Sequence, residues 1–230
     1  MNPEPPADTP PRKRVFLVDD HPMVRERLAL LIDQQLDLQV CGEAGDGIEA
    51  IEGIEKIAPD IAIIDLSLRS SSGLDLIKDL KARGINTPLL VLSMHEESLY
   101  AERVLRAGAM GYVSKQENTR TILQAIRHVL DGGIHVSPSL ASNLVKRMVG
   151  GLQKPETPDV AKLADRELEV FLLIGKGYGT RKIAESLSLS VKTVESYRAR
   201  IKEKLRINDG VQLLQRAVQW VENYRDKKSW

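Results

Sequence analysis

Three aspartates stand directly after two short apolar runs. Asp65 follows residues 61–64, and Asp19 and Asp20 follow residues 15–18. Continuous apolar runs of this length, bounded by turn residues, are typical of buried strands in a parallel sheet. Since ligands bind outside the carboxyl ends of such strands, we expect the three carboxylates to converge at one edge. One aspartate after a strand is more often a turn or capping residue, but two acidic strand ends favour a functional site.

Three further side chains can join this acidic edge. Ser93 ends a predicted strand, Tyr112 lies in the next one, and Lys115 follows it. Clustered carboxylates repel one another, so the site favours a hard, partly hydrated divalent cation with oxygen ligands, and Mg²⁺ fits. Together with a lysine charge and a serine hydroxyl, the set predicts a phosphoryl acceptor in which Asp65 is the nucleophile. The alternatives are packing for the tyrosine, capping for the serine and a surface charge for the lysine.

The elements that position these residues alternate from residue 15 onward. We expect strands at 15–19, 38–44, 61–65, 88–93 and 110–113, and helices at 22–35, 46–57, 73–83, 96–107 and 118–131. The expected helix boundaries are marked by Pro22 in a first helical turn, Asp46 as an N-cap and Gly84 beyond a helix end. Five β/α units with short connections predict an α/β doubly wound, five-stranded parallel sheet.

Composition divides the chain into segments. We expect a disordered leader at 1–14, an α/β domain at 15–131, a linker at 132–160, a small all-α domain at 161–223 and a basic tail at 224–230. Prolines mark the leader, and a polar Gly/Pro stretch at 150–160 marks the linker, in which Pro138 starts one short helix. The all-α domain has four helical patterns, at 165–175, 180–187, 191–205 and 209–223.

The charge is divided unevenly, although the whole chain is near neutral. Residues 160–230 carry 15 Lys and Arg against 9 Asp and Glu, which gives +6, and the remaining residues carry 18 against 23, which gives −5. This asymmetry suggests an acidic module joined to a module that meets a polyanion such as nucleic acid.

The sequence predicts no membrane segment and no signal peptide. The apolar runs are far shorter than the ~18 residues that span a bilayer, and the N-terminus lacks an apolar signal stretch. Cys41 is the single cysteine and forms no internal disulfide, which suits a reducing compartment, so we expect a soluble cytoplasmic protein. The histidines show no shared ligand spacing and are expected at the surface or at helix ends: His21, His95, His128 and His135.

Two helices in the basic part have the spacing of a helix-turn-helix. Residues 180–187 and 191–205 are separated by a very short connection, in which Ser190 can cap the second helix. One face of that second helix should be buried, because it carries Val194, Ile201 and Leu205. The opposite face carries Lys192, Glu195, Ser196, Ala199, Arg200 and Glu203. Such side chains suit a DNA major groove, and an ordinary solvated helix face is the alternative.

The motifs of the acidic part together resemble the receiver domain of bacterial two-component response regulators. They are Asp19-Asp20-His-Pro-Met, Asp65 with Gly73 eight residues on, Ser93, and Gly108-Ala-Met-Gly-Tyr112-Val-Ser-Lys115, over about residues 14–131. The resemblance implies a flavodoxin-like fold and Asp65 as the phosphorylated residue. It also implies that Asp19, Asp20 and Asp65, with the backbone carbonyl of Ser67, hold Mg²⁺.

The same resemblance implies roles for the remaining site residues. Lys115 would pair with the phosphoryl oxygens, and Ser93 and Tyr112 would form a switch. One position departs from the family pattern, because many members have a proline four residues after the phosphorylated aspartate and this chain has Arg69. We expect this substitution to affect the phosphoryl lifetime or the metal geometry.

The basic part resembles the LuxR/NarL-type DNA-binding domain over about residues 160–223. The resemblance is carried by Leu163-Ala-Asp-Arg-Glu167, Gly177, Ile183-Ala184 and Val191-Lys-Thr193-Val-Glu-Ser-Tyr-Arg198 with Ile201 and Lys204-Leu205. It implies a structural role for Glu167 and DNA contacts from the exposed positions Lys182, Lys192, Thr193, Glu195, Ser196, Ala199 and Arg200. Some relatives carry lysine at positions 195 and 199, so no base preference transfers.

The last helix of this part admits two interpretations. Its apolar residues are Val211, Leu214, Val218 and Trp220, and they resemble those of the family's dimer-forming helix. Packing of the helix onto its own domain is the alternative.

Together the resemblances imply a response regulator of the LuxR/NarL (FixJ-like) family. A sensor histidine kinase or small phosphodonor would phosphorylate Asp65, and the C-terminal domain would be released or dimerise on promoter DNA. RNA polymerase is a further partner that this allows, and no turnover enzyme is expected. Two rivals are a Mg²⁺-dependent phosphatase, which would want an acidic residue where Ser67 stands, and a DNA-binding protein whose receiver only dimerises.

Overall fold

In the computed structural model the chain divides into two compact units, Met1–Val149 and Gly150–Trp230. The structure describes residues 11–68, 72–95, 97–149, 159–187 and 189–226. Most of the predicted leader, of the Gly/Pro stretch and of the basic tail, as well as Arg69, therefore lie outside the described residues. No helix within the described ranges is long and apolar enough to cross a membrane.

The first unit is built on five parallel strands. They are β1 (Lys13–Val18), β2 (Leu38–Ala44), β3 (Ile61–Ile64), β4 (Leu89–Ser93) and β5 (Gly111–Ser114). Their order in the sheet is β2-β1-β3-β4-β5, with every neighbouring pair parallel. The predicted five-stranded α/β fold is confirmed. Because the strand order reverses at β1 and β3, the crevice in which such sheets bind ligands lies at the carboxyl ends of these two strands.

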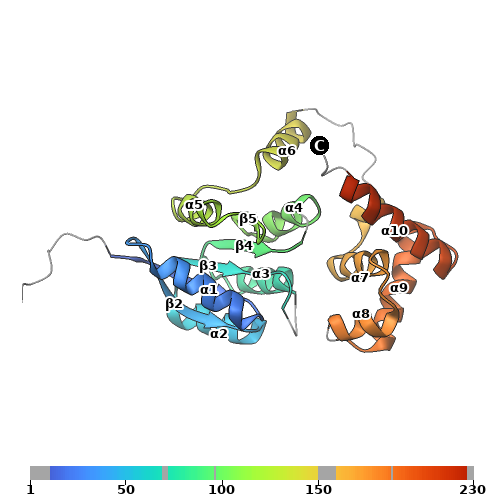
Figure 1. The fold of residues 1–230 in the computed structure, drawn as a ribbon, viewed down its shortest axis with the longest axis horizontal. Helices are drawn as coiled ribbons and strands as arrows, with labels where there is room; N and C mark the ends of the chain where they lie inside the picture. Colours follow the sequence, from blue (N-terminus) through green and yellow to red (C-terminus); the bar gives the residue numbers. More distant parts are fainter. Residues whose placement is uncertain (1–10, 69–71, 96, 150–158, 188, 227–230) are drawn as a thin grey trace, which may run out of the picture. The chain divides into compact units, whose positions relative to one another are not determined.

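Helices cover both faces of the sheet (Figure 1). They are α1 (Pro22–Asp33), α2 (Gly47–Ile57), α3 (Gly73–Ala82), α4 (Glu97–Ala107) and α5 (Thr119–Leu130). Ile32 of α1 and Ile126 of α5 share one buried cluster with Val15 of β1. The next side chain along β1, Phe16, points to the opposite face. There its ring lies so close to α2 that a Cβ at Gly53 would be 2.6 Å from it.

The segment after α5 returns to the free edge of β5. His135 accepts a backbone hydrogen bond from Tyr112 N at 2.8 Å and donates one to Met110 O at 2.9 Å. Ser137 N then donates to the carboxylate of Glu97 at 2.7 Å, at the start of α6 (Pro138–Val149). The first residues of the predicted linker are therefore ordered against the sheet, because an edge strand offers backbone groups that favour pairing.

The second unit contains only helices among its described residues (Figure 1). They are the 3₁₀ turn η1 (Asp159–Lys162), α7 (Asp165–Gly175), α8 (Thr180–Ser186), α9 (Val191–Leu205) and α10 (Gly210–Asp226). The predicted apolar face of α9 is buried, with Val194 and Ile201 fully covered. Helices α7 and α10 approach closely, since a Cβ at Gly175 would lie 2.5 Å from the Ala217 carbonyl oxygen.

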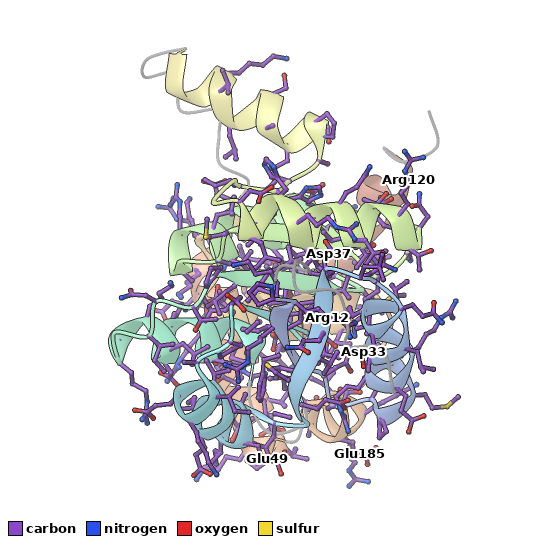
Figure 2. All side chains as sticks on the ribbon, turned by 90° about the vertical axis from the view of Figure 1, so that its left-hand side faces the viewer. Arg12, Asp33, Asp37, Glu49, Arg120 and Glu185 are labelled. Atoms are coloured by element: carbon purple, nitrogen blue, oxygen red, sulfur yellow. The ribbon has the colours of Figure 1, made fainter. Side chains whose placement is uncertain are left out.

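Two arginines fix the loop between α1 and β2 at the amino-terminal edge of the sheet. Arg12 donates to the backbone carbonyls of Asp33 and Gln35, both at 2.8 Å, and Figure 2 labels Arg12 beside Asp33. Arg127 of α5 donates to both carboxylate oxygens of Asp37, at 2.7 and 2.8 Å. This side-chain hydrogen bonding lowers the pKa of Asp37 below its ordinary value. Strand β1 begins at Lys13, two residues earlier than predicted, because Lys13 N donates to the carbonyl of Asp37 in this loop at 2.8 Å.

Gly73 lets α3 begin directly against the end of β3. Gly73 N donates to Leu66 O at 2.9 Å, and the side chain of Ser72 caps the helix by accepting from Leu74 N at 3.2 Å. A Cβ at Gly73 would lie 2.0 Å from the backbone carbonyl oxygen of Asp65, which is far inside contact distance. The eight-residue spacing between Asp65 and Gly73 therefore reflects a steric requirement.

We predict that G73A destabilises the chain. The added methyl group must push α3 away from the backbone of Asp65, so the free energy of unfolding should fall by about 1–3 kcal/mol in urea denaturation. G45A is the matched control, because its Cβ would meet its nearest neighbours at 3.8 and 3.9 Å. It should stay within about 0.5 kcal/mol of the wild type. Equal stabilities of G73A and G45A would contradict this account.

Candidate functional site

Asp65 and Asp19 extend two neighbouring central strands into the same buried corner. Val18 and Ile64 are partners in the register of β1 and β3, and Asp65 N donates to Val18 O at 2.8 Å. Both aspartates are 3% exposed. The expected convergence of the acidic strand ends is therefore a direct result of the parallel register.

Lys115 directly follows the edge strand β5, and its side chain extends past the end of β4 to both carboxylates. Its ammonium Nζ lies 2.7 Å from Asp65 Oδ2 and 2.5 Å from Asp19 Oδ2. The Lys115 backbone is held in turn by Ser93, whose carbonyl accepts from Lys115 N at 2.9 Å. One cation thus bridges the two buried carboxylates. Lys115 is therefore not a surface charge, because its side chain is only 11% exposed.

Burial and charge oppose each other in this cluster. Burial raises the pKa of Asp65 above its ordinary value, and the neighbouring Lys115 ammonium reduces this effect without cancelling it. Burial by itself would lower the pKa of Lys115, but the carboxylates of Asp65 and Asp19 raise it above its ordinary value. The other carboxylate oxygen, Asp65 Oδ1, is buried and accepts no hydrogen bond from the residues that the structure describes.

The acidic corner has the donor set of a divalent-cation site. Ligand atoms of Asp19, Asp20, His21 and Asp65 lie within 4.8 Å of one another. The carboxylate oxygens and the unsatisfied Asp65 Oδ1 fit a hard cation such as Mg²⁺, which prefers oxygen ligands. His21 was not predicted here, yet its Nδ1 lies 2.7 Å from Asp20 Oδ1. Its position directly after the two aspartates was the only signal for it.

Ser93 and Tyr112 meet at the backbone of His95, in the loop after β4. Ser93 is fully buried, and its Oγ accepts from His95 N at 3.2 Å. Tyr112 is 1% exposed and its hydroxyl donates to His95 O at 2.6 Å. The ring of His95 lies with Nε2 2.9 Å from the Oγ of Ser67, two residues beyond Asp65. His95, which was expected at the surface or at a helix end, is partly exposed and connects the predicted switch residues with the loop after β3.

The second unit presents the predicted polar face of α9 to solvent. Its exposed residues include Lys192, Glu195, Ser196, Ala199 and Arg200. Thr193 is partly covered, and Ser190 caps α9 by accepting from Thr193 N at 3.0 Å. On α8, Lys182 is exposed and its ammonium lies 4.1 Å from the ring centre of Tyr178.

Two other predictions concern the scaffold of this unit. Glu167 is 3% exposed and accepts from Ala164 N at 2.8 Å and from Lys204 Nζ at 2.6 Å, so it joins α7 to α9. On α10, Val211 is 65% and Leu214 44% exposed, whereas Val218 is half-buried. Packing within the unit therefore leaves part of the apolar face of α10 uncovered.

Comparison with known proteins identifies the family. Residues 15–127 match the response regulator receiver domain, and residues 161–217 match the luxR family of bacterial regulatory proteins. The oxygen regulatory protein NreC of Staphylococcus carnosus is 34% identical over 209 residues, which cover 89% of this chain and 96% of that protein. The chain belongs to the LuxR/NarL family of response regulators. The first unit is thus a receiver domain and the second a LuxR-type DNA-binding domain, and the protein is a transcription factor.

Solved structures of response regulators agree with this assignment. RcsB from Salmonella enterica serovar Typhimurium, bound to promoter rprA with the phosphomimetic BeF₃⁻, has a TM-score of 0.60 and 26% identity, covering 89% of this chain and 98% of that one. A LuxR-family response regulator from Aurantimonas sp. SI85-9A1 has a TM-score of 0.56 and 33% identity, covering 60% of this chain and 99% of that one.

In metal-free buffer we predict that D65N stabilises the receiver domain at neutral pH. The raised pKa of Asp65 means that its ionised form opposes folding. This opposition is fully present above the folded-state pKa and absent below the ordinary value of 3.8. Urea unfolding of D65N at pH 7 should therefore show a gain of about 0.5–2 kcal/mol that shrinks toward pH 4. D131N, at an exposed helix end, should show neither the gain nor its pH dependence.

Proposed function

We propose that phosphorylation of Asp65 controls the binding of this response regulator to promoter DNA. The observation that carries the proposal is the buried pair of carboxylates, Asp65 and Asp19, bridged by Lys115 beside a cation-binding donor set. The domain division on which it depends is a receiver at 15–131, a linker at 132–160 and a DNA-binding domain at 161–223.

Asp65 would accept the phosphoryl group from a sensor histidine kinase or a small phosphodonor. A bond forms between an Asp65 carboxylate oxygen and phosphorus while the bond between phosphorus and the donor breaks. Asp19, Asp20, Asp65 and the backbone carbonyl of Ser67 would hold Mg²⁺, which when bound neutralises charge on the transferred group. Lys115, already 2.7 Å from Asp65, supplies a cation to the phosphoryl oxygens.

Ser93 and Tyr112 would read the state of Asp65. In the present structure the Ser93 hydroxyl accepts from His95 N, and on phosphorylation its proton would be donated to a phosphoryl oxygen. The Tyr112 ring is buried and its hydroxyl donates to the carbonyl of the same residue, so both groups would respond to Asp65 through one backbone segment. Phosphorylation then favours one of two receiver states by differential stability, which is how such switches act.

The output would be a homodimer on DNA. The exposed face of α9, together with Lys182 on α8, would enter the major groove and contact its phosphates. The exposed Val211 and Leu214, with Val218, favour α10 as a dimer contact. A cytoplasmic location follows from DNA as the target, and RNA polymerase is a further partner of a DNA-bound regulator. The residue two positions after Asp65 is Ser67, which disfavours a phosphatase because no acid–base carboxylate stands there.

Acetyl phosphate with Mg²⁺ should label the wild type with acid-labile phosphate and tighten its binding to a selected promoter fragment. D65N should lose the label and the tightening together, because Asp65 is the proposed nucleophile and an amide does not accept the phosphoryl group. Chelation of Mg²⁺ by EDTA should have the same effect on the wild type, whereas D131N should behave as the wild type. Full labelling of D65N would place the acceptor at another residue, and unchanged affinity on labelling would leave the receiver as a dimerisation module.

The face of α9 is tested by replacing Lys192, Ser196 and Arg200 together with alanine. Loss of two phosphate-contacting charges should weaken DNA binding at least tenfold and reduce the slope of log affinity against log salt by about 1.8. The control K176A/R216A removes two exposed charges elsewhere in the same domain and should change the affinity far less. A footprint of the triple variant equal to that of the wild type would exclude this face.

A further inference from the structure

Lys192 and Glu195 are the charged side chains in the first two turns of the exposed face of α9. Their polar neighbours are engaged within the helix, since Thr193 Oγ1 lies 2.7 Å from Ser190 Oγ and Ser196 Oγ donates to Lys192 O at 3.0 Å. Lys192 and Glu195 are exposed, and within the described ranges their ammonium and carboxylate groups form no hydrogen bond or ion pair. These two charges are therefore available to a ligand.

Glu195 lies in the part of α9 that meets base edges when such a helix enters the major groove. The residues toward the N-terminus of a recognition helix make the base contacts. Positions three and four residues apart are neighbours on a helix surface, so Glu195 lies between Lys192 and Ala199. Ala199 is exposed and its side chain ends at Cβ, so the space beside the carboxylate stays open. The buried Val194 and Ile201 keep this face directed outward.

A carboxylate on this face opposes binding to DNA of arbitrary sequence. Residues 160–230 carry 15 Lys and Arg against 9 Asp and Glu, and this excess attracts phosphates, whereas Glu195 repels them. An ionised carboxylate only accepts hydrogen bonds, so it is favourable in the groove only where a base donates to it. The donors at major-groove edges are the amino groups of cytosine N4 and adenine N6.

Cytosine suits Glu195 better than adenine does. The major-groove edge of cytosine carries the N4 amino group alone, whereas adenine carries the N7 acceptor beside its N6 amino group. That acceptor repels the second carboxylate oxygen. Guanine and thymine present acceptors to the carboxylate and no donor. The guanine paired with cytosine offers O6 and N7, to which the ammonium of Lys192 on the preceding turn can donate. The two exposed charges therefore match the two halves of a C·G pair.

We propose that Glu195 is a specificity-determining residue that selects a C·G pair at one position of the DNA site. It accepts from cytosine N4 and rejects guanine and thymine through repulsion by their acceptors, which is specificity by both attraction and exclusion. The inference rests on the proposed function, because it names a base pair in the DNA that the face of α9 binds.

The test is selection of binding sites from a random DNA pool by the full-length protein, after labelling with acetyl phosphate and Mg²⁺. The wild type should enrich cytosine at one position where E195A shows no preference, with the other positions unchanged. E195Q should move the preference at that position to adenine, since an amide pairs with N6 and N7, and E195K should move it to guanine.

Affinities for two fragments separate base reading from a change in charge. On the fragment selected by the wild type, E195A should bind about tenfold more weakly, as for the loss of one base contact. On a fragment without the site E195A should bind as tightly as the wild type or more tightly, because a repulsive charge is gone. E185A is the matched control, since it removes an exposed carboxylate from α8 and should leave every selected position unchanged. Urea unfolding reports whether the variants retain the fold.

Three results would overturn the inference. They are a selected sequence for E195A equal to that of the wild type, guanine or thymine at the position that E195A loosens, and equal weakening of E195A on both fragments. In each case the labelled wild type still selects DNA, so the proposed function stands. A wild type that selects no sequence with or without the label overturns the proposed function instead. The two failures are therefore distinguishable.

Discussion

The receiver domain depends on a single cation placed between two buried carboxylates. Asp19 and Asp65 are both almost inaccessible to water, and removal of two like charges from water is costly unless an opposite charge accompanies them. Lys115 provides that charge from the end of β5, a strand that is not adjacent to β1 or β3, which the two aspartates follow. The ionised form of Asp65 is still disfavoured in the folded state, since burial raises the pKa of Asp65 despite the neighbouring lysine. Any further charge placed in this corner would therefore alter the balance between burial and ion pairing.

The backbone around the site is set by close contacts that leave little freedom. Gly73 brings the first turn of α3 against the carbonyl of Asp65, so the loop after β3 is anchored by α3. The loop after β4 is anchored by the two hydroxyls of Ser93 and Tyr112 at His95. Tyr112 N also donates to the backbone carbonyl of His135, beyond α5, so strand β5 is paired with the segment that follows α5. Hydrogen bonds thus connect Tyr112 both to the loop after β4 and to the chain segment after α5.

The DNA-binding domain uses the same physical solution on a smaller scale. Glu167 is a buried carboxylate whose charge is met by Lys204 and by a backbone N–H at the start of α7. This joins the scaffold helix to the recognition helix α9, whose apolar residues Val194 and Ile201 are fully covered. The residues left outside include the basic Lys192, Arg200 and Lys204, which can meet phosphates, beside the acidic Glu195 and Glu203. The apolar and the charged residues of α9 are therefore separated onto opposite faces of one helix.

The amino-acid sequence by itself determined the alternation of strands and helices, the place of Asp65 at a strand end and the two faces of α9. These features depend on periodicity and composition within one element, which a single sequence displays. Only the tertiary structure decided that Lys115 would lie between Asp19 and Asp65, that His95 would bond to Ser67, and that His135 would pair with β5. The first two contacts join residues that are 96 and 28 positions apart. Such contacts arise where strand ends and loops meet after the sheet has packed, and no local pattern records them.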